Sequence, residues 1–178
     1  QILKSEFGIK SEIVLDPIFL IENIFLDTKV KNEESKCVIY GNYFSKYEIK
    51  KITDYCKKNK LKILSIGYYN NWTQNNIKLD PFEFLNEIKN SKIIFTSMFH
   101  GIQFAVKYNK NFWFSNDPYR KDKLDYFLKV LGLNKRIIEE NSNFDEEIDY
   151  INLENKLKKW KVSSKEFLLD SINSIGMV

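Results

Sequence analysis

Short apolar runs alternate along the chain with segments of helical periodicity, and this alternation most limits the folds that the chain can adopt. The runs are continuously apolar, as in strands buried on both faces of a parallel sheet. They predict strands at residues 13–15, 37–40, 63–67, 93–96 and 112–114. The intervening spacing predicts helices at residues 47–58, 82–88, about 100–108 and about 124–131.

Because crossovers between parallel strands are right-handed, this order of elements predicts an α/β fold with a Rossmann-like, three-layer parallel sheet. We expect one domain over residues 1–178, with its core at about 12–138. Two helical segments are expected within residues 151–175, packed on the sheet or directed to another domain.

Composition excludes several classes of protein. With 178 residues, 43% of them hydrophobic, the chain can bury one ordinary core. Its net charge of +4 is spread along the chain, which argues against a nucleic-acid partner. No apolar run approaches the roughly 20 residues of a membrane span. Cys37 and Cys56 lack the spacing of a disulfide framework or zinc site, which favours a reducing cytoplasm.

Ligands of open parallel sheets bind at the carboxyl ends of the strands, where four loops are expected: 16–17, 41–43, 68–80 and 96–101. The last reads Thr96-Ser97-Met98-Phe99-His100-Gly101 and enters a helix, whose first N–H groups attract anions. Thr96 or Ser97 is expected to cap this helix or to hold a ligand oxygen. Gly101 permits close approach of a ligand, and His100 supplies a group that transfers protons near neutral pH.

Purely structural interpretations of these residues remain open. Ser and Thr at a helix start are commonly caps, and a single histidine there is often only a hydrogen-bonding group. The chain has two arginines, Arg120 and Arg136, and the planar guanidinium group of arginine suits bidentate binding of phosphate or carboxylate. We favour a site role for Arg120, which is expected at the same sheet edge as His100, and surface charge for Arg136.

The other loops give weaker signals. Asp16-Pro17 is interpreted as a strand terminator, and the aromatic residues of the third loop either stack on a sugar or cover the core: Tyr68, Tyr69 and Trp72. Residues 71–73 match a glycosylation acceptor, but nothing indicates secretion. The sequence has no glycine-rich phosphate loop, no cluster of metal ligands and no assignable Ser-His-Asp set, so metal and serine-hydrolase sites are not expected.

Several landmarks occur in an order typical of one family. They are Asp16-Pro17 before apolar residues, the strand end Val38-Ile39-Tyr40, the helix start Asp80-Pro81, the motif at 96–101, Asn109-Lys110-Asn111-Phe112, and Arg120 before Leu131-Gly132-Leu133 and Arg136. Over residues 16–136 the chain resembles the C-terminal half of polysaccharide pyruvyl transferases. One departure is Met98, where the family typically has Ser or Arg, and a methionine does not bind phosphate.

The resemblance implies one half of a two-domain enzyme of the GT-B type, and a chain starting at Gln1 without a leader is expected to be part of a longer protein with an N-terminal domain. The implied reaction transfers pyruvyl from phosphoenolpyruvate to a sugar of a surface polysaccharide, with no metal or other cofactor. His100 is then the acid or a phosphate ligand, Ser97 and the helix start hold an anion, and Arg120 is a second clamp.

Two alternatives stay open. A GT-B glycosyltransferase would use a nucleotide sugar and needs a carboxylate for the ribose, for which Asp117 is the candidate. A noncatalytic carbohydrate-binding domain would keep the fold without the reaction, and Met98 is the feature that favours it.

Overall fold

The computed structural model describes residues 6–8, 11–21, 35–115 and 121–175. Two compact units are distinguished, and each is described by itself. One contains residues 25–150, and the other combines residues 1–24 with 151–178.

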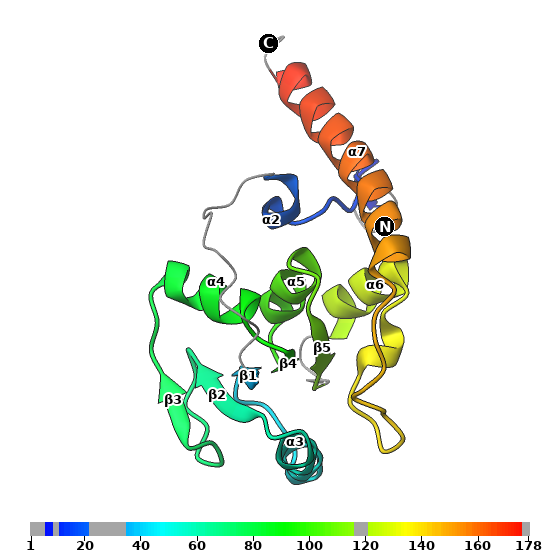
Figure 1. Ribbon diagram of the computed structural model, residues 1–178. Helices are drawn as coiled ribbons and strands as arrows, with labels where there is room; N and C mark the ends of the chain where they lie inside the picture. The colour runs from blue at the N-terminus through cyan, green and yellow to red at the C-terminus, as the bar shows by residue number, and fades with distance from the viewer. Residues whose placement is uncertain (1–5, 9–10, 22–34, 116–120, 176–178) are drawn as a thin grey trace. The chain divides into compact units, whose positions relative to one another are not determined.

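The larger unit is built on a five-stranded parallel sheet, which confirms the expected Rossmann-like α/β fold. Its order is β3-β2-β1-β4-β5 (Figure 1). The strands are β1 (Lys36–Tyr40), β2 (Lys62–Ile66), β3 (Asn75–Ile77), β4 (Ile93–Thr96) and β5 (Asn111–Phe114). The sequence analysis missed β3, because its three residues are all exposed and include two asparagines rather than an apolar run.

Helices cover both faces of the sheet. Their bounds are α3 (Lys46–Lys58), α4 (Pro81–Lys89), α5 (Phe99–Lys107) and α6 (Lys121–Leu131), close to the predicted ranges. The chain passes from β1 to β2 toward one edge of the sheet, whereas it passes from β3 to β4 and from β4 to β5 toward the other edge. Because such crossovers are right-handed, α3 lies on one face and α4 and α5 lie on the opposite face (Figure 1). Edge-to-face contact between Phe99 and Phe127 joins α5 to α6, with ring centroids 5.5 Å apart.

The core has one layer on each face of the sheet. On the α3 side, Ile52 and Cys56 belong to the same buried cluster as Cys37 and Phe95. Cys37 and Cys56 are free thiols, and burial together with the neighbouring Cys56 raises the pKa of Cys37. On the opposite side, the Phe84 ring of α4 lies 4.8 Å from the Tyr40 ring.

The segment after α6 completes the α3-side core. The short 3₁₀ helix η2 (Asn134–Arg136) leads into the polar run 141–147, in which Phe144 is only 3% exposed and its ring lies 4.7 Å from that of Phe95. Arg136 fixes this run, because its guanidinium donates to the carbonyls of Glu146 and Glu147 at 2.7 and 2.6 Å. Arg136 is therefore a buried structural residue rather than surface charge.

The smaller unit contains α2 (Pro17–Leu20) and most of α7 (Tyr150–Ile175). The expected strand at residues 13–15 is wrong, since the Leu15 N–H donates to Ser164 Oγ at 3.0 Å instead of entering a ladder. Asp16-Pro17 does not end a strand: Asp16 caps α2, accepting from Ile18 N–H at 3.2 Å.

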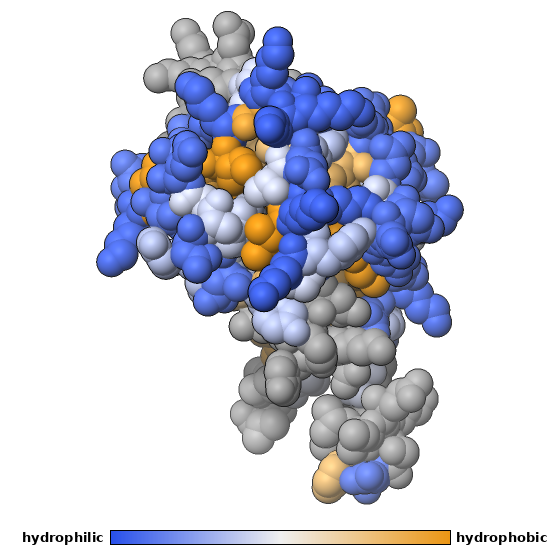
Figure 2. Space-filling view, turned by 90° about the horizontal axis from the view of Figure 1, so that it is seen from below, coloured by the Kyte–Doolittle hydropathy of each residue, from blue (hydrophilic) through white to orange (hydrophobic). Residues whose placement is uncertain are grey.

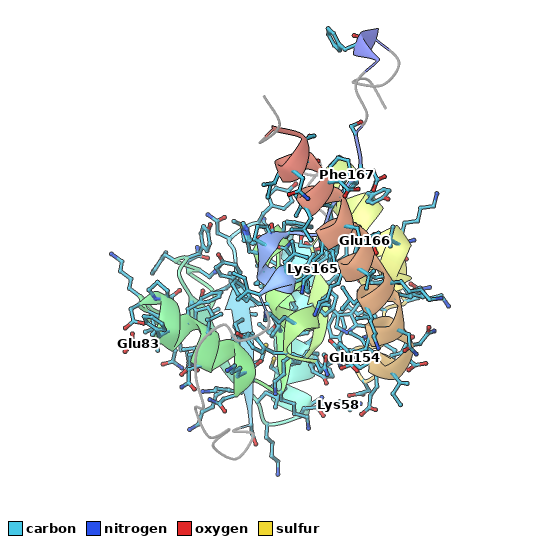
Figure 3. All side chains as sticks on the ribbon, turned by 90° about the horizontal axis from the view of Figure 1, so that it is seen from above. Lys58, Glu83, Glu154, Lys165, Glu166 and Phe167 are labelled. Atoms are coloured by element: carbon cyan, nitrogen blue, oxygen red, sulfur yellow. The ribbon has the colours of Figure 1, made fainter. Side chains whose placement is uncertain are left out.

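The two expected C-terminal helices are one helix of 26 residues, because the sequence between them contains no helix breaker. Its middle carries Lys165, Glu166 and Phe167 in succession (Figure 3). Among the described residues, no helix combines the length and the hydropathy that crossing a membrane requires.

Candidate functional site

The carboxyl edge of the sheet has a topological switch point between β1 and β4. These strands are neighbours, with Tyr40 beside Thr96, but their onward connections run to opposite sides of the sheet. In open parallel α/β folds, ligands bind at such a switch point. The loops that leave β1 and β4 here contain Gly41 and Ser97, and Ser97 is the second residue of the predicted motif at 96–101.

Thr96 secures the end of β4 to its neighbour. Its fully buried hydroxyl donates to the carbonyl of Tyr40 at 2.7 Å and accepts from the Met98 N–H at 3.0 Å. The Thr96 carbonyl also accepts from Ser115 N–H at 2.9 Å, after β5. The Thr96 side chain is thus committed to contacts within the protein, which supports its structural interpretation over a ligand contact.

Gly101 permits close packing of α5 against the sheet. A Cβ at this position would lie 2.8 Å from Thr96 Cβ and 2.9 Å from Tyr40 Cδ1, closer than side chains pack. The close approach that the sequence suggested for a ligand is therefore made by the protein's own strands.

Ser97 joins the two loops at the switch point. Its Oγ accepts a hydrogen bond from the Tyr43 N–H at 3.2 Å, and its own N–H donates to the Tyr40 carbonyl at 3.1 Å. Gly41, with φ of +112°, passes so close that a Cβ there would collide with Ser97 Oγ. Among the described residues, the Ser97 hydroxyl donates its hydrogen to no group, so this donor can serve a ligand.

The N-cap residue of α5 provides no side-chain cap. The N-cap residue is Met98, whose side chain makes no capping hydrogen bond, so the expectation that Thr96 or Ser97 caps the helix is wrong. The physical reason is position: the Thr96 hydroxyl bonds the N–H of Met98 itself, before the helical turn begins. Met98 therefore supplies no polar side chain that would offset the partial positive charge of the helix start.

His100 is the second residue of α5 and is exposed. Its ring meets that of Phe99 edge to face, with centroids 6.2 Å apart. In the part of the chain that the structure describes, its imidazole takes part in no hydrogen bond and no ion pair. Arg120 and Asp117 lie outside the described residues.

Two buried polar residues at this edge were missed by the sequence analysis. Asn70 is 4% exposed, and its amide donates to the Gly41 carbonyl at 2.9 Å and to Ser65 Oγ at 2.8 Å, tying the loop after β2 to the loop after β1. Glu48 is 8% exposed and accepts from Ser45 N–H and Ser115 Oγ at 2.7 and 3.0 Å. The sequence signal for Glu48 is the capping-box spacing from Ser45.

The aromatic loop contributes one exposed ring. Trp72 packs edge to face on Phe44 at 5.9 Å, and Tyr68 packs on Tyr40 at 5.6 Å. Tyr69 is 77% exposed. Of the three aromatic residues considered for sugar stacking, two therefore pack within the protein and Tyr69 presents its ring to solvent.

Two described cavities lie at the opposite, amino edge of the sheet. One, of about 450 Å³, is lined by Lys92, Lys110, Asp145 and Glu147 among others, so its charges balance. The other, of about 610 Å³, opens beside the starts of β1 and β2. No group of three or more His, Cys, Asp or Glu side chains suited to a metal occurs among the described residues.

The family comparison agrees with the motif at the switch point. The model of the family described as "Polysaccharide pyruvyl transferase" matches residues 1–118, which include all five strands and the motif at 96–101. No curated protein and no solved structure gives a significant match. Since the matched segment covers about two thirds of the chain, the resemblance inferred from the sequence is confirmed, and the chain belongs to the polysaccharide pyruvyl transferase family.

Proposed function

We propose that the chain is part of an enzyme that transfers the pyruvyl group of phosphoenolpyruvate to a sugar of a cell-surface or exopolysaccharide precursor in the cytoplasm. Family membership supports the transferase class. The identity of the donor, the identity of the acceptor and the presence of an N-terminal domain in the complete enzyme are parts of this proposal.

The reaction joins two hydroxyls of one sugar to the enol carbon of the donor. The two hydroxyls lose one proton each. One proton is balanced by the proton that converts the methylene group into a methyl group, and the other is balanced by the proton on the released hydrogen phosphate. Two new C–O bonds form while the bond between the enol carbon and the phosphate oxygen breaks, leaving a cyclic ketal that retains the carboxylate. The protein must therefore supply an acid near the methylene carbon and groups that stabilise the phosphate and carboxylate.

The observation that carries the proposal is the Ser97 hydroxyl, which donates to no group among the described residues and lies beside the start of α5, where the N-cap residue Met98 has no polar side chain. Together they suit an anionic oxygen of the donor at the β1/β4 switch point. His100, exposed and one residue into α5, is the proposed acid or phosphate ligand. Arg120 is the proposed second clamp. Met98 provides no charge, so the cation usual at that position in one branch of the family must come from elsewhere.

The test is ligand-observed NMR of the complete protein with phosphoenolpyruvate, a UDP-sugar and a CMP-sugar in turn. Ser97→Ala and His100→Ala are compared with Lys135→Gln, an exposed control outside the motif. We expect phosphoenolpyruvate to bind wild type and the control. We expect Ser97→Ala to bind phosphoenolpyruvate about tenfold more weakly or worse, because it loses one hydrogen bond to a charged group.

Two results would contradict the proposal. Binding of a nucleotide sugar without phosphoenolpyruvate would indicate a GT-B glycosyltransferase. If no donor binds but an oligosaccharide still does, the result would indicate a noncatalytic carbohydrate-binding domain.

A further inference from the structure

The positive charge is less evenly distributed than the composition suggests, because it is concentrated in two short segments of the chain. Residues 57–62 and residues 156–161 each contain four lysines and no acidic residue. The second segment lies along α7. The first lies at the amino edge of the sheet, where α3 ends and β2 begins.

A tight turn presents the first group of lysines. Lys60 adopts a φ of +54°, and the N–H of Leu61 donates back to the Cys56 carbonyl at 2.9 Å, so the chain reverses directly from helix into strand. Lys57, Lys58 (labelled in Figure 3), Lys60 and Lys62 are all exposed. Within the described part of the chain, none of these four pairs with a carboxylate.

The helix end explains only part of this charge. Cations in the last turn of a helix interact favourably with its dipole, which accounts for Lys57 and Lys58. That explanation does not extend to Lys60 and Lys62, which follow the helix. Lys62 stands beside Lys36 in the register of β1 and β2, so Lys36 lies at the same edge.

Lys36, Lys60 and Lys62 line the cavity of about 610 Å³, which we call the lysine cavity. Glu87 also lines it but is paired with Lys36 at 2.6 Å, so among the residues that the structure describes, the unpaired charge in the cavity belongs to Lys60 and Lys62. The remaining wall is partly aliphatic, with Ile63, Leu64 and Ile77. Viewed from the α3 side, the surface is mostly hydrophilic and its hydrophobic patches are small (Figure 2).

Aliphatic walls beside unpaired ammonium groups suit a carboxylated sugar. The C–H face of the sugar ring packs on the aliphatic side chains, while the carboxylate accepts hydrogen bonds from the lysines. Pyruvyl transfer creates such a sugar, because the ketal that it forms retains one carboxylate. We propose that the lysine cavity binds carboxylated sugars of the modified polysaccharide, an inference that rests on the proposed function.

The position of the cavity fits product retention rather than catalysis. α3 runs from the carboxyl edge to the amino edge over 13 residues, about 20 Å. Ser97 lies at the carboxyl edge and the lysine cavity at the amino edge of the same compact unit. A polymer modified at one edge is then held at the other while a further segment reacts.

The experiment measures binding of oligogalacturonate, which carries one carboxylate per sugar, to the full chain by calorimetry. A maltooligosaccharide of equal length is the neutral comparison. The variant Lys58→Gln/Lys60→Asn/Lys62→Gln removes three charges, and asparagine tolerates the left-handed conformation of Lys60. The matched control Lys158→Gln/Lys159→Gln/Lys161→Gln removes three charges from α7.

We expect oligogalacturonate to bind wild type and the α7 control alike and the cavity variant about tenfold more weakly, with recovery when the same three lysines are replaced by arginine. Equal binding of the neutral oligosaccharide, or equal weakening in both variants, would overturn the proposal. Tighter capture by phosphatidylglycerol vesicles than by oligogalacturonate would assign the lysines to a membrane surface instead. Pyruvyl transfer to a short neutral acceptor should be unchanged in the cavity variant, so failure of this inference is distinct from failure of the proposed reaction.

Discussion

The Cα of Gly101 faces the side chain of Thr96 so closely that no Cβ fits between them. A methyl group at Gly101 would lie 2.8 Å from Thr96 Cβ. The contact joins the first turn of α5 to the last residue of β4 and therefore sets where the following helix start lies at the switch point.

We expect Gly101→Ala to lower the free energy of unfolding by about 1–3 kcal/mol, because the added methyl overpacks the joint between α5 and the sheet. Urea denaturation measures the effect. In an unobstructed helix, replacing glycine by alanine raises the free energy of unfolding by roughly 0.5–1 kcal/mol. The sign of the change in Gly101→Ala therefore shows whether the joint is overpacked. A stabilised variant would show that the backbone moves away without cost.

Replacing His100 by alanine should affect the reaction and leave the fold intact. If His100 is the general acid, the rate of phosphate release from phosphoenolpyruvate with an acceptor falls by about a hundredfold or more. The melting temperature should stay that of wild type, because the side chain is exposed and makes no hydrogen bond among the described residues. Turnover within about threefold of wild type would rule out the acid role.

Glu48 should contribute more to stability than its counterpart in the next capping box. Glu48→Ala removes a buried carboxylate that accepts from both Ser45 and Ser115, and we expect a loss of about 1–3 kcal/mol in the free energy of unfolding. Glu83 (labelled in Figure 3) accepts from Asp80 N–H at 3.1 Å and is exposed, so Glu83→Ala should cost about 0.5–1 kcal/mol. Equal losses would mean that the Ser115 contact adds nothing.

Arg136→Lys should loosen the run at residues 141–147. A lysine cannot reproduce the fork that reaches Asn111 Oδ1 and the two backbone carbonyls, so the free energy of unfolding falls by about 2 kcal/mol. Limited proteolysis should then cut this run faster than in wild type. Lys135→Gln, at an exposed neighbouring position, is the control and should change neither property.

Stability should decline in alkaline solution through Tyr150. Burial raises the pKa of its phenol, partly opposed by the positive charge of Arg136, and its hydroxyl donates to the Lys110 carbonyl at 2.6 Å. A raised pKa in the folded state favours the protonated form, so its contribution is complete below the unfolded value of about 10 and is lost as the pH rises beyond it. Urea denaturation should show a smaller alkaline decline in Tyr150→Phe than in the exposed control Tyr69→Phe.

The sheet was predictable from sequence because buried parallel strands are continuously apolar, as in residues 93–96. Prediction failed where tertiary contacts decide the local conformation. The Leu15 segment is apolar enough for a strand, but its backbone N–H bonds a serine of a distant helix. Residues of the motif at 96–101 could be placed at the carboxyl edge, whereas the contacts of Asn70 with Gly41 and Ser65 depend on loop geometry that no short-range pattern encodes.

The division of roles within residues 96–101 has a consequence for how such chains change over time. Thr96 and Gly101 hold a joint of the fold, whereas His100 is exposed and, among the described residues, only its ring contact with Phe99 joins its side chain to the fold. Replacing His100 is therefore expected to change the stability of the fold little. If His100 has the proposed role, a descendant of this chain can lose the proposed reaction while it keeps its stability, Thr96 and Gly101. In relatives of this chain, the residue at the position of His100 would then report on the proposed reaction, whereas Thr96 and Gly101 report on the fold.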